Sequence, residues 1–269
     1  PKEMLPVGEK PVVQYVAEEL EQSGIRRLAF VTGPGKTAIE NHFDIDSELI
    51  LSLRENGQEP LLETLEYERM EVEYIYTRQR RQLGLGHAIL SARSVVMDQP
   101  FVVALGDSII GVHAKSKVVK QMIDLFEQLQ ADAVIAFEEV PREEVNRYGI
   151  ATVGKEHGGY FELADLVEKP DVEEAPSRLA VASRYVFRAE LFEYLENTAT
   201  GKGNEIQLTD AISTWIRAGG KVFGIPLADG EQRFDIGNFP SYFKAFFEFA
   251  SQDPKYGASF LEFVRQRTV

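Results

Sequence analysis

Two aspartates occupy places where an α/β protein can hold a divalent cation. Asp107 ends the segment FVVALGD, directly after an apolar run and a glycine, and Asp235 lies in RFDIGN. Hard cations such as Mg²⁺ are bound by one or two carboxylates together with substrate phosphates. Ligands of open α/β sheets lie outside the carboxyl ends of the strands. Asp107 and Asp235 are therefore candidate ligands of one metal ion, although an aspartate that caps a turn has the same local pattern.

An acid and a base stand side by side at the end of a second predicted strand. In VEKP, Glu168 can accept hydrogen bonds from sugar hydroxyls and Lys169 can meet a phosphate. On a regular strand the two side chains point to opposite faces, so both can equally be solvated. Gly149 in RYGI either permits close backbone contact with a ligand or makes a bend. Lys2, taken alone, is a solvated lysine near a terminus.

Two glycine-rich segments follow predicted strands. The segment 33–37 (GPGKT) is similar to part of a phosphate-binding P-loop, but Phe30 stands where the full motif needs its first glycine. A turn that caps the next helix is the favoured interpretation. The segment 84–87 (GLGH) lets a ligand approach the backbone at a helix N-terminus, or is a plain tight turn. Gln79, just upstream, can read a nucleobase because its amide both donates and accepts.

The composition excludes several classes of function. The 269 residues carry 29 Lys+Arg against 43 Asp+Glu, a formal net charge of −14, which argues against a nucleic-acid partner. The absence of Cys excludes disulfides, thiolate nucleophiles and Cys-ligated metals. The four His residues show no metal-ligand spacing, and no GxSxG motif supports a hydrolase. No apolar run approaches roughly 18 residues and no signal peptide is visible, so we expect a cytoplasmic protein without a membrane span.

The elements that must position these residues alternate along the first half of the chain. Helical periodicity covers residues 11–24, 37–43, 47–56, 60–69, 87–96 and 117–129. Buried or alternating strands are predicted over 27–32, 71–77, 101–105 and 132–137. This order predicts a Rossmann-like, doubly wound α/β sheet of parallel strands with helices on both faces.

The later half changes character. The stretches 149–153, 160–168 and 179–187 are β-rich, which predicts a smaller antiparallel elaboration of sugar-binding size and a sheet that is mixed overall. Helices are predicted over 207–218, 241–249 and 258–266. No linker or repeat interrupts residues 1–269, so we expect a single domain. The segment 239–249 is rich in aromatic residues, which either pack in the core or form a subunit interface.

Nine segments occur in an order that resembles the sugar-phosphate nucleotidyltransferase family, and within it the bacterial UTP–glucose-1-phosphate uridylyltransferases. They are PKEMLPVGEKPVVQYV, VTGPGKTAIENHFD, GLGHAIL, ALGD, RYGI, LVEKP, APSRLAVASRYVF, GNEIQLTDAI and RFDIGN. The family's nucleotide-binding loop, of the form GxGTRxxPxTK, is expected a few residues before PKEMLP. Pro1 falls just after the expected end of this loop, so we expect the loop to lie upstream of Pro1.

The resemblance implies a nucleotide-diphospho-sugar transferase type of fold and a role for nine residues. Lys2 matches the lysine that contacts the phosphates of both substrates, and Gln79 and Gly84 match positions that read the uracil. Asp107 and Asp235 match the Mg²⁺ pair, Asp107 also lying at the nucleotide. The pocket for glucose 1-phosphate is matched by Gly149, Glu168, Lys169 and Val181.

The reaction that the resemblance implies is in-line attack of glucose 1-phosphate on the α-phosphorus of UTP, with Mg²⁺, giving UDP-glucose and pyrophosphate. Such chemistry depends on positioning and charge neutralisation more than on acid or base groups. A homodimer or homotetramer is also implied. Two alternatives stay open at this point: the same reaction with dTTP, giving dTDP-glucose, and a non-catalytic module that binds a sugar nucleotide.

Overall fold

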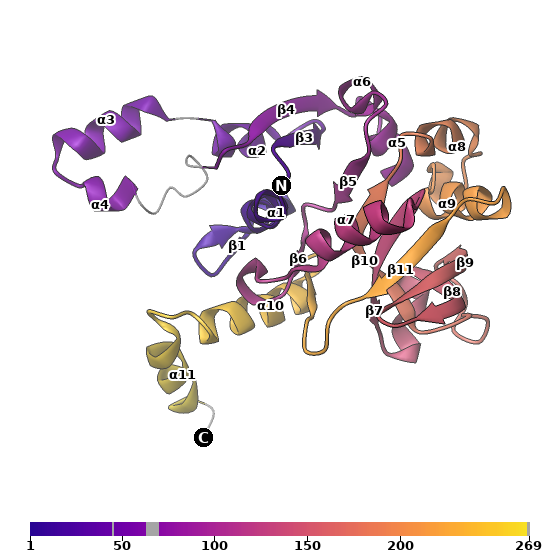
Figure 1. Cartoon of the computed structure of the whole chain (residues 1–269). Helices are drawn as coiled ribbons and strands as arrows, with labels where there is room; N and C mark the ends of the chain where they lie inside the picture. Colours follow the sequence, from indigo (N-terminus) through magenta and orange to yellow (C-terminus); the bar gives the residue numbers. More distant parts are fainter. Residues whose placement is uncertain (45, 63–69, 268–269) are drawn as a thin grey trace.

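A six-stranded mixed sheet forms the centre of the protein (Figure 1). The computed structural model describes residues 1–44, 46–62 and 70–267. The strand order is β5-β10-β7-β11-β9-β8, in which β7 and β11 pair in parallel and the other neighbours are antiparallel. The bounds are β5 Phe101–Ala104, β7 Ala133–Glu139, β8 Gly149–His157, β9 Tyr160–Glu168, β10 Leu179–Phe187 and β11 Val222–Pro226.

The mixed α/β class is confirmed, but the early strands are not one another's neighbours. We expected the strands of the first half to form one parallel sheet, but β10, from the later half, lies between β5 and β7 and is antiparallel to both. The β-rich later half is therefore built into the central sheet. Strand pairing depends on contacts between distant segments, which periodicity along the chain does not report.

Helices cover both faces of this sheet, as expected. On one face, α7 (Val118–Leu129) packs its apolar stripe against β7 and β10. On the other, α8 (Leu191–Asn197) and α9 (Leu208–Arg217) cover the larger core cluster, together with α5 (Gly84–Leu90). The core thus lies on both faces of the sheet, which fixes the strand ends that carry the candidate site.

A second, parallel pair of strands lies beside the main sheet. β3 (Arg27–Thr32) pairs with β4 (Glu73–Arg78), and α1 (Val12–Gln22) and α2 (Thr37–Phe43) pack on it. A groove of about 950 Å³ separates β3 from β5. Consecutive residues of both strands line the groove. If one face of each strand lined it, only every second residue would do so, because side chains alternate between faces. The backbone edges of the two strands therefore border the groove.

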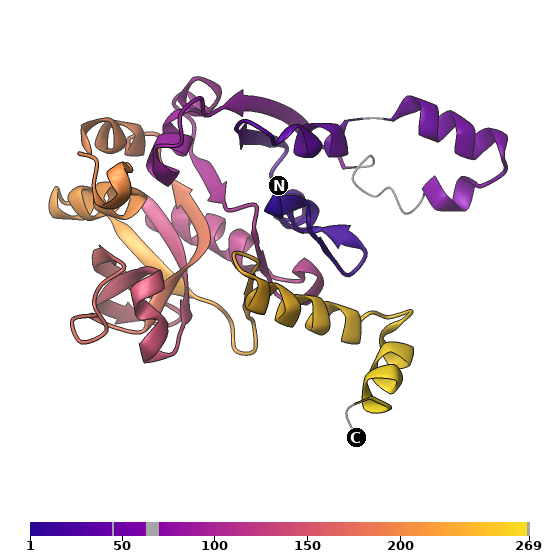
Figure 2. The same cartoon turned by 180° about the vertical axis from the view of Figure 1, so that it is seen from behind.

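The remaining elements are short or peripheral. They are the 3₁₀ turns Lys2–Met4, Val112–Ala114, Arg142–Arg147 and Lys202–Asn204, the strands β1 Pro6–Val7, β2 Lys10–Pro11, β6 Ser108–Ile110 and β12 Arg233–Asp235, and the helices α3 Ser47–Glu55, α4 Glu59–Leu62, α6 Arg93–Val96, α10 Phe239–Ser251 and α11 Gly257–Arg265. Seen from behind, α3 with α4 and α10 with α11 extend away from the sheet on the same side (Figure 2). Within the described residues, no helix has the length and apolar character that a membrane crossing requires.

Several predicted bounds agree with the structure and several do not. β3 and α2 begin and end where the sequence predicted. The helix predicted over 87–96 begins earlier, at Gly84, and is divided into α5 and α6. α8, β6, β11 and β12 were not predicted. Most of the helix predicted over 60–69 lies outside the described residues, since 63–69 are not among them.

Candidate active site

Six of the nine predicted site residues line one cavity of about 290 Å³ at the edge of the central sheet. They come from the loop after β5, from the facing ends of β8, β9 and β10, and from β12: Asp107, Gly149, Glu168, Lys169, Val181 and Asp235. The strands converge there because β8 and β9 form a hairpin whose open end faces the carboxyl end of β5.

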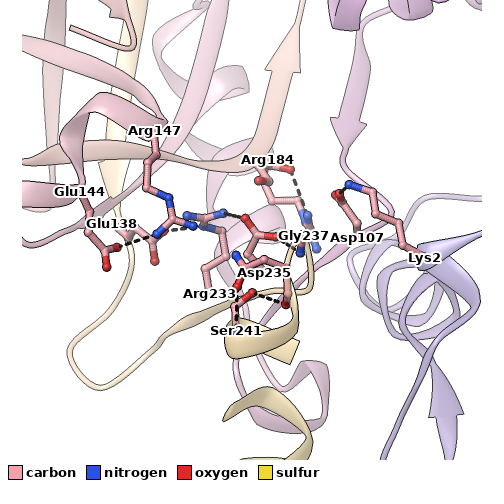
Figure 3. A network of polar contacts seen from close by, with 12 residues as sticks. Lys2, Asp107, Glu138, Glu144, Arg147, Arg184, Arg233, Asp235, Gly237 and Ser241 are labelled. Carbon is pink, nitrogen blue, oxygen red and sulfur yellow. Dashed lines mark hydrogen bonds and ion pairs between the residues drawn. The ribbon is translucent and has the colours of Figure 1, made fainter. Parts of the chain in front are cut away.

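Lys2 reaches the same cavity through Asp107. The Nζ of Lys2 lies 2.5 Å from Oδ2 of Asp107, a carboxylate that is 18% exposed (Figure 3). Partial burial of Lys2 opposes its charge, but the hydrogen bond and negative charge of Asp107 outweigh burial, so the pKa of Lys2 is raised. The ammonium therefore stays charged at neutral pH, close to where phosphates would bind.

Asp235 is brought to Asp107 by a short antiparallel pair of strands. β12 pairs with β6 so that Asp235 lies opposite Ser108, the residue after Asp107, and the N–H of Ile236 donates to the carbonyl of Asp107. The carboxylate of Asp235 accepts from the N–H of Gly237 and lies 3.2 Å from Arg233 (Figure 3). A Cβ at position 237 would lie 2.9 Å from Oδ1 of Asp235, so a side chain there would push on that carboxylate.

The two aspartates fit a hard divalent cation that substrate phosphates help to bind. Among the described residues, no group of three or more His, Cys, Asp or Glu could hold a metal ion by itself. Mg²⁺ is usually bound by one or two carboxylates, several waters and phosphates rather than by an all-protein cage. The donor set of Asp107 and Asp235 is of this kind.

The arginine that pairs with Asp235 is buried. Arg233 is 5% exposed, binds Glu138 at 2.5 Å and lies over the ring of Tyr148 at 4.7 Å. Burial opposes its charge, but the charge and hydrogen bond of Glu138 outweigh burial and raise the pKa of Arg233. The prediction from sequence missed this residue, although a charged side chain two positions before Asp235 on a short strand was a usable signal.

The end of the cavity that β8 and β9 form is closely packed. Gly149 lies directly opposite Glu168 in the β8–β9 ladder, and a Cβ at position 149 would meet Thr209 at 2.8 Å and Val181 at 3.4 Å. Thr209, which the sequence analysis did not single out, donates its hydroxyl to Oε2 of Glu168 at 3.0 Å.

Lys169 shares the cavity with Glu168 although the two are adjacent in the chain. Its Nζ lies 3.3 Å from Oε1 of Glu168. Lys169 has φ +45°, outside the extended conformation of a strand, so the alternation of side chains ends at Glu168. Both side chains therefore reach one site, whereas a regular strand would separate them.

The remaining two predicted residues contact each other outside the cavity. The amide nitrogen of Gln79 donates to the carbonyl of Gly84 and to Nδ1 of His87, both at 3.0 Å. Gly84 has φ +89° and opens α5, whose second residue, Leu85, lines the cavity. In the other glycine-rich segment, Lys36 precedes α2 and forms an ion pair with Glu3 at 2.5 Å.

Comparison with known proteins identifies the family of the chain. The nucleotidyl transferase family model matches residues 1–252. A UTP–glucose-1-phosphate uridylyltransferase of Staphylococcus haemolyticus is 40% identical over 266 residues, which cover 99% of this chain and 90% of the relative. One from Staphylococcus epidermidis is 39% identical over the same coverage.

Solved structures show the same similarity. A UDP-glucose pyrophosphorylase from Acinetobacter baumannii matches with TM-score 0.88 and 34% identity over 100% of this chain and 92% of that one. A UDP-glucose pyrophosphorylase complexed with UDP-glucose matches with TM-score 0.82 and 36% identity over 93% of this chain and 90% of that one. The resemblance seen in the nine sequence segments is confirmed: the chain belongs to the nucleotidyl transferase family, and its relatives there are the UTP–glucose-1-phosphate uridylyltransferases.

Proposed function

We propose that this protein transfers the uridylyl group of UTP to glucose 1-phosphate, producing UDP-glucose and pyrophosphate. The observation that carries the proposal is the cavity itself. One cation, Lys169, and three acids, Asp107, Glu168 and Asp235, line it, and a second cation, Lys2, is paired with Asp107. A site for two phosphorylated substrates needs this combination of cations, metal-ligand carboxylates and a carboxylate for hydroxyl groups.

The residues act mainly by positioning the two substrates. A phosphate oxygen of glucose 1-phosphate attacks the α-phosphorus of UTP, and the bond from that phosphorus to the oxygen of the β-phosphate breaks with release of pyrophosphate. Lys2, kept charged by Asp107, neutralises the phosphates, and Lys169 holds the phosphate of the sugar. Glu168, oriented by Thr209, accepts sugar hydroxyls. Mg²⁺ held by Asp107 and Asp235 would supply further neutralisation of charge on the phosphates.

Gln79 is suited to a pyrimidine with an N–H at position 3. Its amide nitrogen is engaged by Gly84 and His87, which leaves the carbonyl oxygen as the group that can accept from the base. Uracil and thymine share that N–H, so Gln79 does not choose between UTP and dTTP. Competition between the two nucleotides in one assay measures the preference.

The groove between β3 and β5 adjoins the candidate site. Two strand edges border it, and aliphatic side chains of α1 and α5, among them Val16 and Ile89, line its walls. Lys2 and Asp107 line the same groove, so it extends to the place where we propose that the phosphates bind.

The test is pyrophosphate release by the product of the full reading frame, with UTP, glucose 1-phosphate and Mg²⁺. We expect Asp107→Asn to lower kcat by at least ~10²-fold, since a main charge-stabilising group is removed. Asp124→Asn is the matched control, because Asp124 pairs with Lys120 on the surface of α7 and should leave the rate unchanged. Full activity of Asp107→Asn would refute the assignment, and an inactive wild-type protein would refute the function.

A further inference from the structure

Arg184 is a fully buried charge inside the apolar strand β10. It is 0% exposed, and so is its partner Glu19 on α1. Nε and Nη2 of Arg184 donate to Oε2 of Glu19 at 3.1 and 2.6 Å, while Nη1 donates to the carbonyl of Ser183 and Nη2 to the carbonyl of Ser108. Each nitrogen of the guanidinium therefore has a partner. The other oxygen of Glu19 has none among the described residues.

Such a pair is costly as a device for stability alone. Taking two charges out of water costs several kcal/mol per ion, and apolar residues of similar volume often stabilise a fold as well or better. An apolar pair cannot form the hydrogen bonds that Arg184 donates to backbone carbonyls. These carbonyls belong to Ser108 and Ser183, which both lie at the candidate site.

Both bonded carbonyls belong to the frame around Asp107. Ser108 follows Asp107 and is the cross-strand partner of Asp235, so it belongs to the strand pairing that brings the two aspartates together. The carbonyl of Ser183 also accepts from the N–H of Leu105, two residues before Asp107. Arg184 thus bonds Ser108 at one end of the segment 105–108 directly, and it is linked to Leu105 at the other end through the carbonyl of Ser183.

The strand is deformed at this place. The register of β10 against β7 shifts between Val181 and Tyr185, and Ser183 adopts φ +61°, a left-handed conformation that is uncommon for residues other than glycine. Local strain of this kind persists only where surrounding contacts hold it. The bulge directs the carbonyl of Ser183 to Leu105 and to the guanidinium at once.

We propose that Arg184, seated by Glu19, is a positioning residue that sets the separation of the carboxylates of Asp107 and Asp235 for a divalent cation. The inference rests on the proposed function, since that function supplies the reason for a metal between the two aspartates. Partners that orient metal ligands from behind typically change metal affinity by 10–100-fold when they are lost.

The test uses Mn²⁺ as the probe, with the dissociation constant in the presence of UTP measured by electron paramagnetic resonance. The main variant is Glu19→Leu/Arg184→Met, which removes both buried charges at once. We expect its melting temperature to stay within a few degrees of wild type, while the Mn²⁺ dissociation constant and the Mg²⁺ concentration for half-maximal pyrophosphate release each rise at least ~10-fold.

Two further variants complete the experiment. Arg184→Lys keeps a charge against Glu19 but loses the fork that reaches both carbonyls, so we expect a folded protein with a smaller rise in the same two quantities, and it serves if the double variant does not fold. Arg188→Met is the control: Arg188 directly follows β10 and bonds the carbonyl of Ala131, away from the cavity. It should leave both quantities unchanged.

The outcomes separate the inference from the function on which it rests. Folded Glu19→Leu/Arg184→Met or Arg184→Lys protein with the Mn²⁺ dissociation constant and Mg²⁺ requirement of wild type would overturn the positioning role. A wild-type protein that binds Mn²⁺ with UTP but releases no pyrophosphate at saturating substrates would instead overturn the proposed function.

Discussion

At the scale of single residues, the sugar end of the cavity depends on the absence of one methyl group. A Cβ at position 149 would lie 2.8 Å from Cγ2 of Thr209, which is itself buried, so one of the two must move. Movement of Thr209 breaks its hydrogen bond to Glu168, the carboxylate assigned to the sugar hydroxyls. Gly149 is therefore needed because it leaves room for Thr209.

We predict that Gly149→Ala raises the KM for glucose 1-phosphate at least ~10-fold, because lost orientation of a substrate-binding carboxylate weakens binding and the methyl group fills the pocket. The KM for UTP should change much less, since Gln79 and Gly84, which are assigned to the base, lie outside this cavity. Initial rates with one substrate varied at a time give both constants.

The matched control is Gly158→Ala, in the turn between β8 and β9. A Cβ there meets no atom within 4 Å, so the variant should show wild-type constants. Equal changes in the KM of both substrates in Gly149→Ala would contradict the assignment of Gly149 to the sugar pocket.

At the scale of elements, local sequence patterns predicted single helices and strands well, but they predicted poorly which strands pair with each other. β3 and α2 were predicted at their observed bounds because a buried apolar run and a periodic stripe are local signals. α8 and β11, of seven and five residues, were not predicted, although α2 is no longer than α8. The place of β10 between β5 and β7 depends on contacts between distant segments.

The candidate site shows the same division. Asp107 and Glu168 were found because strand-end carboxylates have a recognisable pattern. The pairing of Lys2 with Asp107 and the support of Glu168 by Thr209 join distant parts of the chain, and no spacing in the sequence reports them. Arg184 did have a signal: a lone charge within the apolar strand LAVASRYVF is costly unless it is paired and hydrogen-bonded.

One clamp between elements gives a pH-dependent prediction. Asp165 on β9 accepts from Ser213 and Arg217 on α9, at 2.5 and 3.1 Å, and from the N–H of Leu166. Burial would raise the pKa of Asp165, but the hydrogen bonds from Ser213, Leu166 and Arg217 outweigh burial and lower it. A carboxyl whose pKa is lower in the folded state stabilises the fold above its unfolded pKa, and this stability is lost as the pH falls through the folded pKa.

We therefore predict that Asp165→Asn lowers the free energy of unfolding by about 1 kcal/mol at pH 7, the usual value of such hydrogen bonds on a partly exposed group. The difference from wild type should shrink below about pH 4, where the unfolded carboxyl becomes protonated. Urea unfolding at several pH values measures it. Asp229→Asn, in an exposed loop, is the control, and a difference for Asp165→Asn that does not depend on pH would contradict the role of its charge.

At the scale of the whole molecule, the net charge of −14 and the charged substrates are compatible because the site is locally organised. Lys169 and the buried Arg233 line one cavity and Lys2 pairs with Asp107 beside it, and a metal ion held by Asp107 and Asp235 would add positive charge there. The acidic remainder of the surface disfavours binding of polyanions elsewhere.

The C-terminal helices carry the most prominent apolar surface. α10 is anchored on one side, where Phe249 is fully buried against Tyr15 and Phe234. The other side presents Phe239 and Phe243, which are 73% and 64% exposed, on an arm that extends from the body of the protein (Figure 2). Exposed aromatic patches of this kind mark interaction surfaces. We propose that α10 contacts a second copy of the chain in a dimer or tetramer.

The proposal predicts that the protein sediments as a dimer or larger species at micromolar concentration, and that Phe243→Lys shifts it toward the monomer. Lysine places a charge where the interface would exclude water, which costs several kcal/mol when the charge has no partner. Met97→Lys is the matched control, since Met97 is 60% exposed but lies next to α6, away from α10. The buried side of α10 is untouched by either change, so both variants should keep the wild-type melting temperature of the monomer fold. A monomeric wild-type protein across the micromolar range, or equal dissociation by both variants, would show that the aromatic face of α10 has another role.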